Sequence, residues 1–295
     1  MKDFSFQKKI SVIAIVGPTA SGKTAYSIDL AKEIGGEIIS ADSRLVYKGM
    51  DVGTAKPSKS EMQGIPHHMI DIVEPEFEYS AALYQQEAKN KIYEIYTRGK
   101  RPIVVGGTGL YIDILLKNFS LPRIEPDKIL REELSKYSKE ELLDILNRLD
   151  TTCLDELKSA DKKKLIRAIE VLKYTGKSLS DVRGIGESEF NVKWIGRNFK
   201  REDLYERINK RVDLMVENGL IEETIALINK HGKIHNIIDT IGYKEINQYL
   251  EGKITLEEAI DLLKRNTRHY AKRQMTWFRR NTEIEWNIYP EVLKK

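Results

Sequence analysis

Short apolar runs and longer amphipathic stretches alternate along the first part of the chain. The apolar runs predict buried parallel strands at residues 10–16, 37–40 and 102–105. A helix is expected after the first strand, ending at Gly35, and Ser80 is expected to cap a second helix that ends near Arg98. Residues 41–60 are predicted to be a polar loop. Strands that alternate with helices indicate an α/β fold, a parallel sheet flanked by helices on both faces.

The pattern changes after Pro122. Residues 126–183 carry many helix signals and no strand-like run. Ser138 and Glu141 have the spacing of a capping box, and Asp161 is expected to cap a further helix. The segment is therefore predicted to be an all-helical insertion.

The alternating pattern resumes beyond the insertion. Strands are predicted at residues 192–195 and 284–288. Helices are predicted at about 203–217, 220–230, 243–251 and 256–279, the last with Thr255 and Glu258 in capping-box spacing. The predicted domains are a core of residues 1–122 and 190–295 and a helical insertion domain of residues 123–189.

The composition is typical of a soluble globular protein. Apolar residues make up 41% and charged residues 32% of the 295, and no apolar run approaches the roughly 18 residues that span a bilayer. The charged amino terminus lacks the apolar stretch of a secretory signal, so we expect a cytoplasmic protein without a membrane partner. The single cysteine, Cys153, excludes an internal disulfide and is expected to be a buried apolar group. The net charge of +4 is compatible with an anionic partner without requiring one.

Residues 17–24 carry the clearest chemistry. Their sequence, G-P-T-A-S-G-K-T, fits the phosphate-binding loop G-x-x-x-x-G-K-[ST] and stands between a predicted strand and a predicted helix. Backbone N–H groups of such a loop bind phosphate oxygens, Lys23 adds a positive charge, and the Thr24 hydroxyl can hold Mg²⁺. The core is therefore expected to be like that of P-loop NTPases. The phosphate site is expected to consist of Gly17, Pro18, Thr19, Ala20, Ser21, Gly22, Lys23 and Thr24.

An enzyme that hydrolyses a nucleoside triphosphate also needs an acid at the end of a neighbouring strand, where it serves the metal. The strand predicted at residues 102–105 runs into Gly106 and carries no such acid, whereas residues 37–40 lead to Asp42. Ligands bind at the carboxyl ends of parallel strands, so Asp42 is the acid best placed near a bound phosphate. A role in a turn or a helix cap stays open for it.

Residues 264–280 form a basic segment that includes aromatic side chains. They contain seven Lys or Arg and no acid, and Arg265, Arg268, Lys272 and Arg279 fall close to one helical face. The residues alone favour a solvated helix face with aromatic core contacts, and the pattern also fits a nucleic-acid surface. A shorter basic patch with the same two interpretations comprises Lys163, Lys164 and Arg167.

The segment around residues 56–71 has two further candidate features. His67 and His68 lie near Asp71 and raise the possibility of a metal site, but adjacent histidines point in different directions and no further His or Cys supports one. A loop that closes over phosphates is the favoured interpretation. Lys56 could hold phosphate or shape the loop, and both roles stay open.

Several segments together resemble the tRNA dimethylallyltransferase family. The matching segments, in order along almost the whole chain, are ISADSRLVYKGMDVGTAKP at 39–57, GIPHHMID at 64–71, VGGTGLY at 105–111, KLIRAIEV at 164–171, IGYKE at 241–245 and AKRQMTW at 271–277. In combination they are much more specific than the phosphate loop, which many unrelated enzymes share.

The resemblance implies a Mg²⁺-dependent enzyme that moves a dimethylallyl group from dimethylallyl diphosphate to tRNA. The acceptor in the family is the exocyclic N6 amine of adenosine 37 in the anticodon stem-loop, and the phosphate loop would hold the diphosphate of the donor. Asp42 would be the base that takes the proton of the amine, with Lys23 and Thr24 as further catalytic residues and Thr24 as the metal ligand. The enzyme is expected to act as a monomer.

The same resemblance implies three groups of tRNA-contacting residues. The first group follows the second and third predicted strands and comprises Asp42, Ser43, Arg44, Leu45 and Thr108. The second lies in the insertion and comprises Lys163, Lys164, Leu165, Ile166 and Arg167. The third comprises Gly242, Tyr243, Arg268, Lys272, Arg273, Gln274 and Arg279. The target base is stacked in its loop and would have to be extruded to reach the donor.

One position departs from the family pattern. Asp239 stands where some relatives have an arginine that contacts phosphate. Another cation, Lys244 or an arginine of the last helix, is expected to replace it.

Three other functions stay open on the sequence. An isopentenyltransferase acting on free AMP or ATP would use the same donor chemistry without needing the insertion or the basic helix. A small-molecule kinase would use the loop for ATP and leave the basic helix unexplained. A non-catalytic RNA-binding protein would not need intact Lys23, Thr24 and Asp42.

Overall fold

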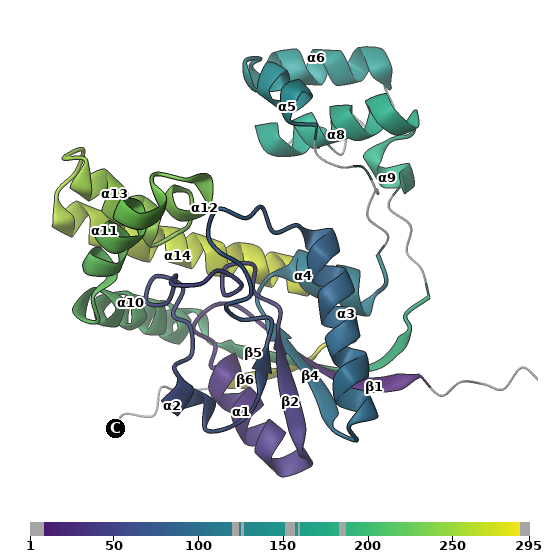
Figure 1. Ribbon diagram of the computed structural model, residues 1–295, viewed down its shortest axis with the longest axis vertical. Coiled ribbons are helices and arrows are strands. Elements are labelled where there is room, and N and C mark those ends of the chain that lie inside the picture. The colour runs from purple at the N-terminus through teal and green to yellow at the C-terminus, as the bar shows by residue number, and fades with distance from the viewer. Residues whose placement is uncertain are drawn as a thin grey trace, which may run out of the picture. The chain divides into compact units, whose positions relative to one another are not determined.

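Six parallel strands form one sheet in the order β3-β2-β4-β1-β5-β6 (Figure 1). The computed structural model describes residues 9–119, 124, 127–150, 157–158, 160–182 and 187–289. The strands are β1 (Ile10–Val16), β2 (Gly36–Ser40), β3 (His67–His68), β4 (Arg101–Gly106), β5 (Phe190–Phe199) and β6 (Glu285–Tyr289). The predicted α/β fold with a parallel sheet is confirmed, and each of the five predicted strands is present.

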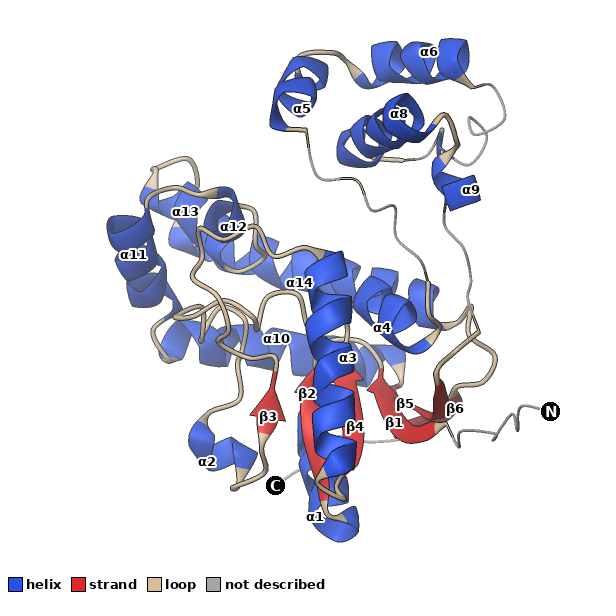
Figure 2. Cartoon of the chain, turned by 45° about the vertical axis from the view of Figure 1, so that its right-hand side comes forward, coloured by secondary structure: helices blue, strands red, loops and turns tan. Residues whose placement is uncertain are grey.

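Helices cover both faces of the sheet. On one face, α1 (Lys23–Ile34) packs Ile28 and Ala31 against alternate residues of the strands, among them Ile15. On the other face lies α3 (Ala81–Thr97), in front of the strands in Figure 2. The predicted ends of both helices are confirmed, because Gly35 closes α1 in the left-handed conformation and the Ser80 side chain caps α3.

The pattern along the chain missed four short elements. They are α2 (Lys59–Met62), β3, α4 (Gly109–Leu116) and α12 (His235–Ile238). Five of the eight residues of α4 are buried, so the helix has no polar face that would show a helical period in the sequence. The other three are too short to carry a period.

The register of the sheet brings the ends of β2 and β4 together. Ser40 pairs with Val105, and the Ala41 N–H donates to the Val105 carbonyl oxygen at 2.7 Å. The Ala41 carbonyl oxygen in turn accepts from the Thr108 N–H at 3.2 Å. A side chain at Gly106 would begin 2.1 Å from that carbonyl oxygen, so only glycine fits there. The turns after β2 and β4 are therefore fixed to each other at the carboxyl edge of the sheet.

Helices of the last third of the chain lie beyond this carboxyl edge (Figure 2). They are α10 (Arg201–Glu217), α11 (Leu220–His231), α12, α13 (Tyr243–Leu250) and α14 (Leu256–Phe278). The predicted capping box of Thr255 and Glu258 opens α14. No helix in the described part of the chain combines the length and the apolar character that crossing a bilayer requires.

Contacts divide the chain into two compact units, one of residues 1–116 and 189–295 and one of residues 117–188. The second unit contains α5 (Lys128–Ser135), α6 (Lys139–Leu149), α8 (Lys162–Thr175) and α9 (Leu179–Val182). The predicted caps at Ser138 and Asp161 are present. The predicted domain boundary at residues 122–123 and the predicted burial of Cys153 lie outside the described residues.

A fully buried carboxylate joins the helices of the second unit. Glu170 of α8 accepts from the Asp127 N–H at 2.8 Å, from Arg131 at 2.8 and 2.9 Å, and from Arg167. Burial alone would raise the pKa of Glu170, but the hydrogen bonds from the two arginines outweigh it and hold the pKa below its ordinary value. The ion pairs therefore compensate a buried charge and tie α5 to α8.

Candidate active site

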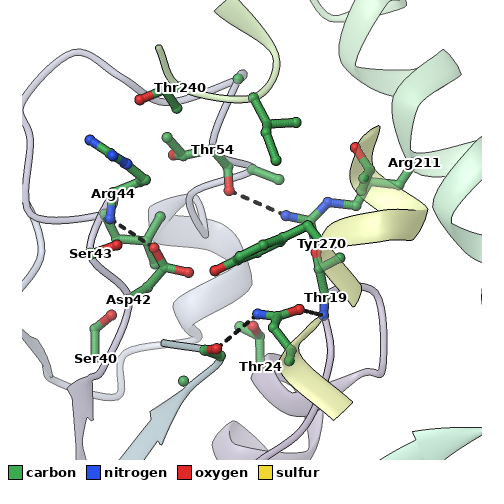
Figure 3. Close-up of a pocket in the computed structure, with 18 of the residues that line it drawn as sticks. Thr19, Thr24, Ser40, Asp42, Ser43, Arg44, Thr54, Arg211, Thr240 and Tyr270 are labelled. Carbon is green, nitrogen blue, oxygen red and sulfur yellow. Dashed lines mark hydrogen bonds between the residues drawn. The ribbon is translucent and has the colours of Figure 1, made fainter. Parts of the chain in front are cut away.

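A cavity of about 580 Å³ opens at the carboxyl edge of the sheet (Figure 3). Its volume lies within the range of roughly 300–1,000 Å³ that is typical of small-molecule sites. Its lining includes the phosphate loop, the segments after β2 and β4, the 53–57 loop, the 239–245 segment, and side chains of α10 and α14. Lining residues from the first unit include Thr19, Lys23, Thr24, Ser40, Asp42, Ser43, Arg44, Leu45, Gly53, Thr54, His67, Gly107, Arg211, Lys244, Tyr270, Arg273 and Gln274.

The phosphate loop has the geometry that its sequence predicts. Gly22 takes a left-handed conformation, φ 74°, immediately before α1 begins at Lys23. The N–H groups of the first helical turn have no partner within the helix and, with the positive end of the helix dipole, are suited to an anion. Gly17 lies so close to β5 that a side chain would begin 2.2 Å from the Arg197 carbonyl oxygen. Of the eight predicted loop residues, Thr19, Lys23 and Thr24 line the cavity.

Two of the cations that line the cavity, Lys23 and Arg211, interact with each other. Burial and the neighbouring Arg211 guanidinium lower the pKa of Lys23 to about 7, while Asp42 acts in the opposite direction. Burial likewise lowers the pKa of Arg211, whose guanidinium donates to the Thr54 carbonyl oxygen at 3.2 Å. Each positive charge disfavours the charged form of the other, and an anion bound near both would compensate this repulsion. The arrangement is therefore suited to a multiply charged anion such as a diphosphate.

Asp42 stands at the end of β2 with a fixed orientation. One carboxylate oxygen accepts from the Arg44 N–H at 2.8 Å. The Tyr270 hydroxyl points toward the carboxylate from α14 (Figure 3), and burial followed by the Asp42 charge raises the pKa of Tyr270 to about 12. The Thr108 hydroxyl accepts from the Ser43 N–H at 3.1 Å and donates to the Ser43 hydroxyl at 3.4 Å. The carboxylate is thus held toward the cavity, where it can accept a proton.

The carboxylate of Glu223 in α11 holds the loop that begins at residue 51 and forms part of the cavity wall. Glu223 accepts from the N–H groups of Asp51, Val52 and Gly53 at 3.1, 2.8 and 2.9 Å, and from the Tyr243 hydroxyl at 2.6 Å. Burial and the Glu223 charge raise the pKa of Tyr243, which therefore stays protonated and donates. Sequence reasoning missed Glu223, because the backbone N–H groups that it binds lie about 170 residues away.

Contacts define the surroundings of Lys56, His67 and His68. Lys56 donates to the Tyr47 carbonyl oxygen at 2.8 Å and pairs with Asp51 and Asp71, so it shapes the loop. His68 bonds Glu37 at 2.7 Å. His67 Nδ1 donates to the Ile65 carbonyl oxygen at 2.8 Å, and the ring lines the cavity.

The side chains of two residues predicted to contact tRNA in the insertion are buried. Leu165 is 0% and Ile166 8% exposed in the core of the second unit, because they lie on the inner face of α8. Arg167 is engaged by Glu170 and by the Ile124 carbonyl oxygen. Lys163 and Lys164 are exposed at the start of α8.

The third group of residues predicted to contact tRNA also contains both buried and exposed members. Gly242, Tyr243 and Gln274 are buried, and Tyr243 and Gln274 use their polar groups inside the protein. Arg268 donates to Asn209 at 2.6 Å and lies over the Tyr205 ring. The exposed members of the group are Lys272, Arg273 and Arg279.

The cation that sequence reasoning missed is Arg211. Asp239, at the position where some relatives have arginine, pairs with His235 at 2.6 Å. Lys244 and Arg273 line the cavity as expected candidates, but Arg211 is the cation that acts directly on Lys23. In the sequence it is one of several basic residues of α10, and nothing in the pattern sets it apart.

The oxygen groups of the cavity fit Mg²⁺. The Thr24 hydroxyl, Ser40 and Asp42 line the same space. The described residues contain no group of three or more His, Cys, Asp or Glu side chains that could hold a metal ion. Mg²⁺ suits such a site, because it keeps several waters and binds through substrate phosphates with one or two protein oxygens.

Fold and site together define a phosphate-loop protein whose cavity combines an anion site with one oriented carboxylate. The chain belongs to the IPP transferase family, whose sequence profile matches residues 45–281, and the isopentenyl transferase profile matches residues 10–76. The chain is 48% identical to the tRNA dimethylallyltransferase of Pelotomaculum thermopropionicum over 288 residues, which is 96% of this chain and 92% of that protein. The resemblance to tRNA dimethylallyltransferases is thereby confirmed.

Solved structures of enzymes that act on tRNA are similar to this chain. The crystal structure of the tRNA isopentenylpyrophosphate transferase of Bacillus halodurans has a TM-score of 0.74 and 44% identity, covering 96% of this chain and 91% of that one. A eukaryotic dimethylallyltransferase acting on tRNA has a TM-score of 0.82 at 29% identity, covering 96% of this chain and 74% of that one.

Proposed function

We propose that this protein transfers a dimethylallyl group from dimethylallyl diphosphate to the N6 amine of adenosine 37 in tRNA. The observation that carries the proposal is one cavity lined by Lys23, Arg211 and Asp42, in which the two cations suit a diphosphate and the carboxylate suits a base. The family membership supports the substrates.

The donor half of the reaction depends on the leaving group. The bond between the first carbon of the dimethylallyl group and the diphosphate oxygen breaks, and the electron pair leaves with the diphosphate. Lys23, Arg211 and the N–H groups at the start of α1 stabilise the charge that develops there. Mg²⁺, when bound through the Thr24 hydroxyl, supplies further positive charge to the diphosphate.

The acceptor half depends on a base. The adenine amine is a weak nucleophile because its lone pair is delocalised into the ring. As the nitrogen forms its bond to the carbon, Asp42 accepts the proton that the amine loses. The hydrogen bond from the Arg44 N–H orients the carboxylate for this step.

The tRNA surface is proposed at exposed basic residues. Lys272, Arg273 and Arg279 lie on the exposed side of α14, and Lys163 and Lys164 are exposed in the second unit, which we propose as a tRNA-binding insertion. Such groups bind the phosphate backbone and position the loop from which the base is extruded. An enzyme acting on free AMP would need neither set.

Incubation with Mg²⁺, dimethylallyl diphosphate and unmodified tRNA tests the proposal. We expect digestion and mass spectrometry to reveal adenosine that carries one dimethylallyl group, and no product when Asp42→Ala is used. Transfer to free AMP alone, or phosphoryl transfer from ATP, would contradict the proposal.

A further inference from the structure

Side chains of α14 contact the turn after β4 and the start of α4. Gln274 Nε2 donates to the Gly107 carbonyl oxygen at 2.9 Å. The Trp277 ring covers Gly109, the first residue of α4, where an added side chain would begin 2.3 Å from the ring. The last long helix thus fixes the turn through its inner face.

Gln274 also reaches the phosphate loop. Its Oε1 accepts from the Thr19 N–H at 2.8 Å, and the side chain is 6% exposed (the dashed lines beside Thr19 in Figure 3). A backbone N–H can only donate and a backbone carbonyl can only accept, so the two partners determine the orientation of the amide. One rigid group therefore bridges residue 19 and residue 107.

The Gln274 bridge lies beyond the last strand pair between β1 and β4. That ladder ends at Val16 and Gly106, after which one segment enters the phosphate loop and the other enters the turn after β4. The turn is coupled to the base through Thr108, which accepts from the Ser43 N–H next to Asp42. Gln274 thus joins the loop suited to the donor to the segment that carries the acid.

We propose that Gln274 is a positioning residue that sets the distance between the bound donor and the acceptor base. The inference rests on the proposed function, since it concerns the geometry of that transfer. The attacking nitrogen has to approach the carbon in line and close to 3–3.5 Å, and a displacement of about 1 Å can lower the rate on the order of 10²-fold. Gln274 itself contacts neither reacting atom in this scheme.

Gln274→Met tests the inference, because methionine has a similar length and no polar end. At saturating donor and tRNA we expect the single-turnover rate of transfer to fall on the order of 10²-fold. The dissociation constants for inorganic diphosphate and for tRNA are expected to change by less than about threefold, since the phosphate-binding and basic residues are retained. Thr276→Ala, on the exposed side of the same helix, is the matched control and keeps the wild-type rate.

Two further variants separate positioning from general damage. Gln274→Glu still accepts from the Thr19 N–H but turns an oxygen toward the Gly107 carbonyl, so its rate also falls. Gly107→Ala places a carbon 2.1 Å from Nε2, displaces the amide and is expected to match Gln274→Met. All rates are measured well below the unfolding midpoint of each variant.

The outcomes are distinguishable. A Gln274→Met variant that transfers at the wild-type single-turnover rate overturns the inference alone. A variant that loses rate only in proportion to weaker binding of diphosphate or tRNA overturns it as well. A wild-type chain that binds tRNA and donor but transfers nothing overturns the proposed function and this inference with it.

Discussion

Substitution of Glu223 tests how the wall of the cavity is held. In the wild type the carboxylate accepts four hydrogen bonds, three from backbone N–H groups of residues 51–53 and one from Tyr243. In Glu223→Gln, one oxygen still accepts from Gly53 and Tyr243. The amide nitrogen, which is itself a donor, then faces the N–H groups of Asp51 and Val52. These two N–H groups therefore lose their acceptor.

The cost can be bounded from these contacts. A hydrogen bond to a charged group contributes about 1.5–3 kcal/mol, so two lost bonds set an upper bound of about 3–6 kcal/mol. Asp51 is exposed and Val52 is half-buried, so their N–H groups can form hydrogen bonds with water. These bonds recover part of the lost free energy. We expect a loss of about 2 kcal/mol in the free energy of unfolding, or about 4–8 °C in the unfolding midpoint.

The assay is urea unfolding of Glu223→Gln beside Glu222→Gln, which removes the same charge from the same first turn of α11. Because Gly53 and Thr54 line the cavity, the Kd for dimethylallyl diphosphate is expected to rise about tenfold in Glu223→Gln only. Equal unfolding free energies for the two variants, within about 0.5 kcal/mol, would refute the reasoning.

Asp42→Ala should abolish transfer while the Kd for tRNA stays within about threefold, and parallel losses of both would contradict its role as a base. Arg211→Met should raise the Kd for inorganic diphosphate at least about tenfold in calorimetry, because a charge in contact with the anion is lost. Glu170→Gln should destabilise the second unit by about 3 kcal/mol in hydrogen exchange, and since the folded pKa of Glu170 is depressed, its contribution is present above the unfolded pKa and lost as pH falls through the folded one. Lys272→Ala with Arg279→Ala should weaken tRNA binding and reduce the slope of log K against log salt by about 2, and an unchanged slope would place the RNA elsewhere.

Local signals in the sequence were sufficient for most of the fold. The strands covered on both faces read as apolar runs, and Ser80, Ser138, Asp161 and Thr255 cap helices through residues only three positions away. The helix α4 was missed because burial on nearly every side removes the helical period.

Side chains whose partners are remote in sequence could not be assigned. Arg211 and Gln274 owe their places to the packing of α10 and α14 beyond the strand ends, and neither differs in type from residues on the solvated faces. For the same reason Tyr243 and Leu165 were expected at an RNA surface although both are buried. The sequence predicts helix faces, but the fold decides which face turns inward.

The cavity depends on both halves of the chain, since residues between 19 and 57 and residues of α14 line it together. A chain cut short by a premature stop between Asp42 and Leu256 would retain the whole phosphate motif and Asp42. It would lack Tyr270 and Gln274, so the anion site would open to solvent and the two loops would lose their bridge. Such truncated alleles are expected to be null, however far downstream of the motif the stop falls.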